Sequence, residues 1–485
     1  MVESPSSAAP SSLKPSRQFQ SRARLVVIGG GISGTSAAWT AAREAVKQEL
    51  DVETLLLEKE TVLGGKASAI REDGWLFETG PLGYLDNEPI VDELVRGVGL
   101  EEERVPASDA SSHRFVFLDG RLKEVASHPV RFLASGLLSP RALLRAACEP
   151  FVRTKRDGLD ESVWDFAARR LGRDVADRLI HPMVLGIFAG DAKRLSLPSA
   201  FPIMAELERD HGSLIRAQLA RSRARRRGTL PPRRSSLFSF RDGLETLPRR
   251  LSERGSFETR TACVVLTVTR REEGFLVVLE GGASIPADSV IVASEGFSAA
   301  SLLADAAPDV SQALAEISYP PVYVIALGYG AEAKRSIPRG FGALIPRGAG
   351  FRSLGVTWDG HLFPGHNAED GLLVRVLLGG TFDPEIAKLD ENAAAAIAEG
   401  EMQRLFALSV APRFLRARLW RQAIPQYELG HGARVQLVDE ALARTPGLFL
   451  AGNALHGTAF GKAAARGVAC GERAIVWLAG RAPKK

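Results

Sequence analysis

Short apolar runs alternate with glycine turns and helix-forming stretches from residue 24 onward. The first run, Leu25–Ile28, ends in a glycine-rich turn, and an alanine-rich stretch follows it. A second run, residues 52–57, ends at the acidic Glu58. A strand, a tight turn, a helix and a second strand form the βαβ unit of a parallel sheet. The pattern therefore predicts a βαβ unit that opens the chain and extends to about residue 100.

The middle of the chain changes from helical to strand-like periodicity. Residues 128–220 carry few strand patterns, and helices are predicted there over 129–139, 140–153, 162–179 and 199–221. Three later runs are short, β-branched and separated by turn residues, over 262–269, 275–280 and 290–293. These runs predict a β-meander.

The last third of the chain returns to strands and then repeats the opening design. Strands are predicted over 322–328, 342–345, 354–357 and 372–378, with an amphipathic helix over 391–409. An apolar run from Leu448 then leads into Gly452 and a helix-forming stretch from about Gly461. We therefore expect the two ends of the chain to share one domain.

These patterns predict an α/β fold, α+β overall, with a discontinuous Rossmann-like domain. That domain is expected to contain residues 23–105, 236–298 and 432–485. Residues 299–431 are expected to form a sheet-based substrate domain, and residues 106–235 a helical lobe. Residues 1–22, rich in Ser, Pro and Ala, are expected to be a disordered lead-in. Ligands are expected in the cleft between the domains.

Composition narrows the cellular setting. The 485 residues are 45% hydrophobic, enough for a large core, and the net charge of +5 selects no class of partner. The three cysteines, Cys148, Cys263 and Cys470, have neither disulfide nor metal spacing, which indicates a reducing, cytoplasmic compartment. No apolar run is long enough to predict a membrane-spanning helix. The lead-in has no apolar secretion signal, but an organelle transit peptide stays open.

One segment is strongly basic. No acidic residue occurs from His211 to Arg241, where the arginines are Arg216, Arg221, Arg223, Arg225, Arg226, Arg227, Arg233, Arg234 and Arg241. Such a segment forms either a solvated helix end and linker or an anchor to anionic lipid. Nucleic-acid binding is disfavoured because no aromatic residues alternate with the arginines.

The opening turn has the spacing of a dinucleotide site. Gly29 permits the tight turn, Gly31 lets the backbone approach a diphosphate, and Gly34 brings the helix close to the strand. Glu58 lies at the distance along the chain expected for a carboxylate that accepts hydrogen bonds from a ribose. The doublet Gly64-Gly65 predicts backbone passing close beside a longer cofactor, FAD.

Two further glycine turns fit the same cofactor. Gly80 and Gly83 flank Pro81 in a rigid turn that can approach a flat ring, although a surface turn has the same pattern. The stretch 452–461 predicts a second helix N-terminus, whose dipole stabilises negative charge on a reduced ring. No histidine pair has metal spacing, and no Ser–His–Asp or Walker motif occurs. The cofactor is therefore expected to perform the redox chemistry.

Four stretches give a more specific resemblance. They are residues 80–89; 186–191 with Leu195-Ser196 and Phe201-Pro202; 338–346; and Trp420 with 424–431. With the glycine motifs, they resemble the oxygen-dependent protoporphyrinogen oxidases, within the wider amine oxidase and phytoene desaturase group of FAD proteins. The likeness extends from about residue 24 to 475.

The resemblance implies an oxidoreductase that acts in haem biosynthesis. Such an enzyme converts protoporphyrinogen IX to protoporphyrin IX, passing six electrons in pairs through non-covalent FAD to three dioxygen molecules, which become hydrogen peroxide. No catalytic residue beyond FAD and no metal is expected. The helical lobe is expected to face a membrane, which makes the protein a peripheral one. A homodimer is also implied, and a nucleic-acid partner is not.

The resemblance also assigns site residues. Those expected at the cofactor are Gly29, Gly30, Gly31, Ile32, Ser33, Gly34, Glu58, Lys59, Gly64, Gly65, Lys66, Gly80, Pro81, Leu82, Gly83, Cys263, Trp420, Gly452, Asn453, Thr458, Ala459 and Phe460. Those expected at the substrate are Gly186, Leu344, Thr357, Leu377 and Leu82. The backbone around Gly186 would accept hydrogen bonds from pyrrole N–H groups.

Three positions depart from the family pattern. Leu82 stands where some members carry an arginine for a substrate propionate, Lys66 replaces an arginine, and Thr357 replaces an aliphatic residue. The substrate carboxylates therefore need another partner. Two alternatives stay open: oxidation of coproporphyrinogen III to coproporphyrin III, and a non-enzymatic escort protein on the same fold.

Overall fold

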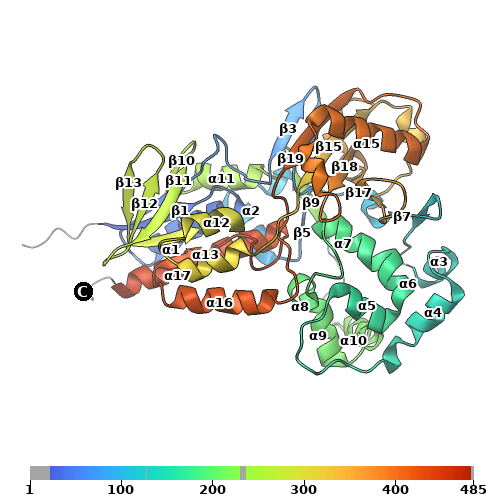
Figure 1. The fold of residues 1–485 in the computed structure, drawn as a ribbon. Coiled ribbons are helices and arrows are strands. Elements are labelled where there is room, and N and C mark those ends of the chain that lie inside the picture. The colour runs from blue at the N-terminus through green and yellow to red at the C-terminus, as the bar shows by residue number, and fades with distance from the viewer. Residues whose placement is uncertain (1–21, 127, 230–235, 482–485) are drawn as a thin grey trace, which may run out of the picture.

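The structure, a computed structural model, describes residues 22–126, 128–229 and 236–481. It has three regions: a parallel sheet with its helices, a second and larger sheet, and a lobe of helices (Figure 1). The predicted lead-in, apart from residue 22, lies outside the described residues, as do Arg233 and Arg234 of the basic segment.

The parallel sheet joins the two ends of the chain. Its strand order is β10-β2-β1-β14-β20, and every neighbouring pair is parallel. The strands are β1 (Ala23–Ile28), β2 (Val52–Leu57), β10 (Glu258–Arg260), β14 (Ser289–Val292) and β20 (Leu448–Leu450). The three segments predicted for the Rossmann-like domain therefore all contribute strands to one sheet. The mixed α/β fold predicted from the sequence is confirmed.

The first and last helices pack closely because of small residues. They are α1 (Ile32–Lys47) and α17 (Phe460–Arg481). A Cβ atom on Gly467 would lie 2.1 Å from the carbonyl oxygen of Ser33, and one on Gly471 would lie 2.5 Å from that of Ala37. The Ser33 hydroxyl donates to the carbonyl oxygen of Ala463 at 2.6 Å. This packing fixes the helix that follows the first glycine turn.

The larger sheet has seven strands in the order β19-β15-β18-β17-β16-β7-β8. They are β7 (Arg114–Leu118), β8 (Arg121–Glu124), β15 (Val322–Tyr329), β16 (Gly342–Leu344), β17 (Ser353–Thr357), β18 (Leu372–Gly379) and β19 (Phe414–Trp420). One face packs on α15 (Glu391–Phe406). β15 and β18 are almost wholly buried because both of their faces are covered.

The helical lobe lies beside the larger sheet (Figure 1). Its helices are α3 (Pro129–Ala134), α4 (Pro140–Ala147), α5 (Val163–Leu171), α6 (Arg173–Val175), α7 (His181–Phe188), α8 (Leu197–Ala200), α9 (Pro202–His211) and α10 (Leu214–Arg226). Ser213 and Glu149 anchor α10, since the Glu149 carboxylate accepts from the amides of Leu214 and Ile215 at 2.9 and 3.1 Å. The buried Arg170 lies 3.3 Å from the same carboxylate.

The remaining elements cover the sheets or connect them. They are β3 (Ala69–Glu72), β4 (Trp75–Glu78), β5 (Tyr84–Leu85), α2 (Pro89–Gly97), β6 (Arg104–Pro106), β9 (Leu237–Phe240), α11 (Thr246–Arg254), β11 (Val265–Arg270), β12 (Phe275–Leu279), β13 (Ser284–Ala287), α12 (Gly296–Leu302), α13 (Pro308–Ala315), α14 (Asp359–Leu362) and α16 (His431–Ala443). Strands β11, β12 and β13 form the antiparallel meander.

The structure corrects three element predictions. The run 290–293 was expected in the meander, but β14 pairs with β1 in the parallel sheet, since this run is buried on both faces. The single helix expected over 199–221 is divided into α8, α9 and α10: Phe201 leaves the helical conformation before Pro202, and Gly212 adopts a left-handed φ of 67° after α9. Strands β7 and β8 lie within residues 106–235, yet β7 pairs with β16 of the larger sheet. The domain boundaries themselves stay predictions.

Candidate functional site

The first glycine turn is shaped by backbone contacts. The amide of Gly29 donates to the carbonyl oxygen of Leu57 at 2.8 Å, and its φ of +111° favours glycine. A Cβ atom on Gly34 would lie 1.7 Å from the carbonyl oxygen of Gly29, so only glycine fits there. Gly31 differs, because the nearest atom to its Cβ position is 3.8 Å away. The backbone at Gly31 therefore borders free space at the start of α1.

That free space suits a diphosphate. Gly31 is the N-cap residue of α1 and provides no side-chain hydrogen bond. The amides of the first helical turn, starting with those of Ile32 and Ser33, therefore have no capping side chain and face the free space. Gly64 forms a parallel bridge with Gly31, and its amide donates to the carbonyl oxygen of Gly30 at 3.0 Å. Gly64 and Gly65 both have positive φ values, 124° and 61°. Two side-chain-free segments thus lie side by side at a helix N-terminus.

Glu58 lies buried at the end of β2, next to this turn. Its Oε2 accepts from the amide of Gly30 at 2.5 Å, and its Oε1 accepts from the amide of Glu60 at 2.9 Å. The carboxylate keeps further lone pairs for ribose hydroxyls. The amide of Cys263 donates to the carbonyl oxygen of Glu58 at 2.8 Å, which brings that predicted cofactor residue to the same place. The Lys59 side chain is largely exposed and lies 3.6 Å from Glu60.

The turn at Gly452 and the turn at Gly29 both pack against the same segment, Ala293-Ser294. A Cβ atom on Gly29 would lie 2.9 Å from the carbonyl oxygen of Ala293, and one on Gly452 would lie 3.3 Å from that of Ser294. The carbonyl oxygen of Asn453 accepts from the Tyr427 hydroxyl. The predicted segment from Gly452 onward therefore lies beside the glycine turn, although some 420 residues separate them along the chain.

The next residues start α17. Thr458 is half-buried and Ala459 is exposed. The buried Phe460 ring stacks on Tyr84, with the ring centroids 5.8 Å apart. This contact holds the start of α17 against the segment that follows the turn 80–83.

Lys66 lies in a partly enclosed cluster of polar and aromatic groups. Its Nζ lies 3.0 Å from Glu295 Oε2 and donates to the carbonyl oxygen of Ala423 at 2.5 Å. The rings of Tyr319 and Trp420 lie 5.7 and 5.9 Å from the same atom. Burial lowers the pKa of Lys66, and the carboxylate of Glu295 opposes that shift. This ion pair places one cation directly after the Gly64-Gly65 doublet.

The turn 80–83 is crowded on both sides. A Cβ atom on Gly80 would lie 1.9 Å from the carbonyl oxygen of Lys66, and one on Gly83 would lie 2.6 Å from that of Phe238. The indole N–H of Trp420 donates to the carbonyl oxygen of Thr79 at 2.7 Å. This bond connects the turn with β19. Pro81 is half-buried between the two glycines.

Leu82 points into a small apolar core. It is buried and packs with Leu362 and Phe363, in a cluster that contains none of the other predicted substrate residues. Its predicted role at the substrate stays a prediction.

Those other substrate residues lie on one face of the larger sheet. Leu344 pairs with Gly355, which pairs with Leu377, and Thr357 lies two residues after Gly355 on the same face. Gly186 of α7 covers this face, since a Cβ atom there would lie 2.4 Å from Leu344 Cδ2. The structure thus brings Gly186, Leu344, Thr357 and Leu377 together.

A buried polar network beside these residues escaped the sequence analysis. Arg375 Nη1 donates to the carbonyl oxygens of Glu78 and Gly80 at 3.1 and 2.6 Å, and Nε lies 3.0 Å from Asp359 Oδ2. Thr357 Oγ1 donates to Asp359 Oδ1 at 2.5 Å. The sequence did contain a clue, because Arg375 is the one charge in an otherwise apolar run, residues 372–379.

Burial perturbs the pKa of the Asp359 carboxyl group in this network and that of the Glu78 carboxyl group beside it. Desolvation raises the pKa of Glu78 to about 8, against a hydrogen bond from the amide of Leu244 and the charge of Arg375. Desolvation also raises the pKa of Asp359, while Arg375 and the Thr357 hydroxyl oppose that shift. Near neutral pH, Glu78 is therefore largely protonated.

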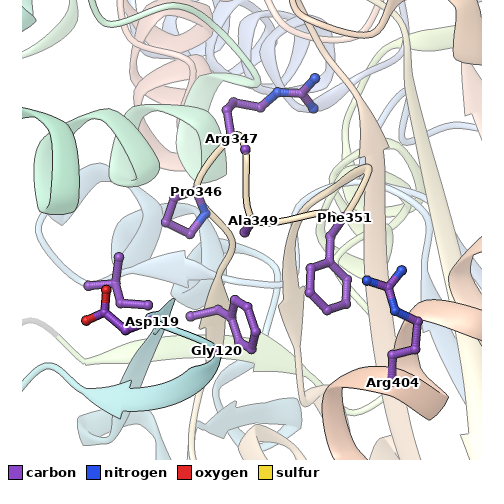
Figure 2. Close-up of a pocket in the computed structure, with 10 residues that line it drawn as sticks. Asp119, Gly120, Pro346, Arg347, Ala349, Phe351 and Arg404 are labelled. Carbon is purple, nitrogen blue, oxygen red and sulfur yellow. The ribbon is translucent and has the colours of Figure 1, made fainter.

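Figure 2 shows a hollow elsewhere on the larger sheet. It has a volume of about 500 Å³ and is lined by the β7–β8 turn, by the loop after β16 and by Arg404 of α15. Arg404 lies over the Phe351 ring at 4.4 Å. None of the residues predicted for cofactor or substrate line this hollow.

Two classes of feature are lacking in the described part of the chain. No helix there combines the length and apolar character needed to cross a membrane. No group of three or more acidic, histidine or cysteine side chains there could hold a metal ion.

Three comparisons place the chain among known proteins. The family model described as flavin containing amine oxidoreductase matches residues 32–475. Protoporphyrinogen oxidase 1, chloroplastic, of Spinacia oleracea is 31% identical over 463 residues, which cover 90% of this chain and 81% of the relative. Coproporphyrinogen III oxidase of Bacillus subtilis (strain 168) is 28% identical over 468 residues, which cover 94% of this chain and 98% of the relative.

A solved structure has the same fold. The crystal structure of a putative protoporphyrinogen oxidase from Exiguobacterium sp. 255-15 has a TM-score of 0.80 and 24% sequence identity, covering 94% of this chain and 99% of that chain. A cyclohexylamine oxidase from Brevibacterium oxydans IH-35A has a TM-score of 0.68 and 15% identity. The resemblance drawn from the sequence motifs is thereby confirmed.

Proposed function

The chain belongs to the flavin containing amine oxidoreductase family, and from that premise we propose that it oxidises a porphyrinogen, with protoporphyrinogen IX as its preferred substrate. It is an oxidoreductase that carries FAD, so the alternative of a non-enzymatic escort protein is set aside. Relatives named for protoporphyrinogen and for coproporphyrinogen III both match over most of the chain. Coproporphyrinogen III is therefore the second candidate.

The residues around the glycine turns, which we call the cofactor half of the site, fit FAD. The side-chain-free backbone at Gly31 and Gly64 and the amides of the first turn of α1 would hold the diphosphate, and Glu58 would accept from a ribose. The turn 80–83 and the segment from Gly452 would lie along the ring system. When bound, FAD would accept a hydride, which is two electrons and a proton, from a carbon atom of the substrate.

One juxtaposition carries the proposal. The turn 80–83 is joined to the larger sheet by two hydrogen bonds, from Trp420 to the carbonyl oxygen of Thr79 and from Arg375 to that of Gly80. The face of the sheet that carries Arg375 also carries Leu344 and Leu377. A flat apolar macrocycle would pack between that face and the turn, where the leucines exclude water and Gly186 leaves its backbone accessible. Removal of six electrons and six protons would convert the porphyrinogen to the porphyrin, with three dioxygen molecules reduced to three of hydrogen peroxide.

The deciding experiment is anaerobic mixing of the purified holoenzyme with each porphyrinogen, followed at the flavin absorbance. We expect bleaching with both, and faster bleaching with protoporphyrinogen IX. Equal rates, or a faster reaction with coproporphyrinogen III, would contradict the substrate preference. No bleaching with either would contradict porphyrinogen oxidation itself. A repeat in air that measures hydrogen peroxide tests dioxygen as the acceptor.

Peripheral association with an anionic membrane is part of the proposal. The lobe exposes Leu144, Phe151 and Leu159 at 69%, 84% and 72% of their surface. Helix α10 adds Arg223 and Arg226, and Arg227 follows at its end; all three are exposed. Large exposed apolar side chains and exposed arginines on one lobe suit a lipid surface, where the apolar groups would enter and the cations would meet the headgroups. A homodimer stays a prediction.

A further inference from the structure

Arg375 is a buried cation on the face of the larger sheet that carries the proposed substrate residues. It lies on β18, two residues before Leu377 and directly opposite Thr357 in the register of β17 and β18. Its side chain is only 6% exposed. Alternate residues of a strand share a face, so Arg375, Leu377 and Thr357 lie on the same side of the sheet.

Four contacts of Arg375 use only two of its nitrogens, Nε and Nη1. Nε lies 3.0 Å from Asp359 Oδ2 and 3.4 Å from Thr357 Oγ1, while Nη1 serves the carbonyl oxygens of Glu78 and Gly80. Nη2 forms no hydrogen bond with any residue that the structure describes, and it is not fully enclosed. A guanidinium held at two nitrogens with its third free is oriented for a further acceptor.

The position of this free nitrogen matches a need of the substrate. Porphyrinogens carry carboxylates, and Leu82 lies in an apolar core where it offers no charge. Arg375 reaches the same turn from the sheet, since Nη1 is 2.6 Å from the carbonyl oxygen of Gly80.

The other cations near this face have partners or lie at its edge. Lys66 is paired with Glu295, Arg416 is paired with Glu72, and Arg418 is exposed over the Trp420 ring. Arg375 is also paired, with Asp359, but it is the buried cation of this set whose Nη2 forms no hydrogen bond with any described residue and so stays available to a carboxylate.

We propose that Arg375, held by Asp359 and Thr357, binds one carboxylate of the porphyrinogen and so determines substrate specificity at this site. The proposal rests on the proposed function. It also explains why a hydroxyl stands at position 357, because Thr357 donates to Asp359 and accepts from Arg375. An aliphatic residue there would leave the ion pair without this contact.

A purely structural role makes a different prediction. If Arg375 only held the turn through the carbonyl oxygens of Glu78 and Gly80, its loss would disturb every planar ligand alike. The two roles are separated by ligands that differ in carboxylates but not in ring size.

The test measures porphyrin binding to the holoenzyme by quenching of porphyrin fluorescence. Protoporphyrin IX carries two carboxylates and octaethylporphyrin carries none. We expect Arg375→Met to weaken protoporphyrin IX binding about tenfold or more, as for loss of a charge-assisted hydrogen bond, and to leave octaethylporphyrin binding unchanged. Arg416→Met is the control, since Arg416 lies in the same cross-strand row and is also paired with a carboxylate, that of Glu72, but its side chain is exposed.

Each other outcome overturns the assignment. Equal weakening of both porphyrins would show that Arg375 only holds the turn, and unchanged binding of both would show that it meets no carboxylate. If Arg375→Met does not fold, Arg375→Lys gives the same comparison, because lysine keeps the charge and is expected to bind protoporphyrin IX better than Arg375→Gln does. Suppose that a porphyrinogen reduces the flavin of the wild type while Arg375→Met binds protoporphyrin IX as the wild type does. That result would contradict this inference and support the proposed function.

Discussion

The two halves of the site are built in different ways. The cofactor half consists of backbone, where glycines remove side chains at Gly31 and Gly64 and a missing Cβ brings α1 onto the turn at Gly34. The substrate half consists of side chains, Leu344, Leu377 and Arg375, that strands far apart in the chain bring to one face. On the proposed function, a cofactor shared by many enzymes would be held by chain geometry, and the variable ligand would meet replaceable side chains.

The largest expected effect is on the cofactor half, from Gly31→Val. The space around the Gly31 Cβ position lets the protein fold, but the new side chain would occupy the place proposed for the diphosphate. We expect purified protein with almost no bound flavin, measured as the ratio of flavin to protein absorbance.

Gly400→Ala is the control for this change, because Gly400 lies in α15 with no neighbour within 4 Å of its Cβ position. Full flavin loading of Gly31→Val would place the diphosphate elsewhere.

A second expected effect leaves both halves intact. Replacing Arg223, Arg226 and Arg227 together by alanine removes three exposed cations, each contributing about 1 kcal/mol at an anionic surface. Sedimentation with anionic vesicles in low salt should weaken by roughly a hundredfold, while flavin content and porphyrin binding stay at wild-type values. Unaltered sedimentation would remove the basic segment from the membrane proposal. Neutral vesicles serve as the reference surface.

A third change tests the substrate half alone. Leu377→Ala would open a gap in the apolar face, with a loss of about 2 kcal/mol of packing. We expect KM for the porphyrinogen to rise by about thirtyfold and flavin content to be unchanged. A drop in flavin content with KM unchanged would mean that Leu377 supports the cofactor half instead.

The smallest expected effect concerns the boundary between the halves. The pKa of Glu78 is raised to about 8 in the folded protein, so the native state holds a proton that the unfolded state releases above its usual pKa of 4.5. The stability from this group is therefore full at low pH and is lost as pH rises through about 8. In Glu78→Gln the side chain cannot ionise, so the variant should not lose this stability as the pH rises.

The measurement is thermal unfolding at pH 5 and pH 9 for both proteins. The Tm difference, Glu78→Gln minus wild type, should be more positive at pH 9 by about 2 °C or more. A difference that does not change with pH would mean that Glu78 ionises normally. Subtracting the wild type cancels the contributions of the other buried groups.

The local geometry of the first glycine turn could be predicted from the sequence in more detail than the polar network around Arg375, for a physical reason. The turn 29–34 and the strands around it form from local contacts, so their spacing is visible in the chain. The pairing of Thr357 with Arg375 depends on the register of two strands, which no local pattern records. For the same reason, the addition of β7 and β8 to the larger sheet escaped prediction. Lys66 was expected near the cofactor, but its pairing with Glu295 was not foreseen.

The close packing of α1 against α17 has a consequence for how the protein matures. During synthesis on the ribosome, β20 and α17 emerge after the other strands and helices described above, so until then β14 lacks one of its two neighbours and the glycine-matched surface of α1 stays uncovered. The nascent chain can form the opening βαβ unit early, yet the segment from Gly452, which lies beside the first glycine turn in the folded protein, is then still missing. We therefore expect the yellow colour of the protein to develop only after residues 448–481 have left the exit tunnel.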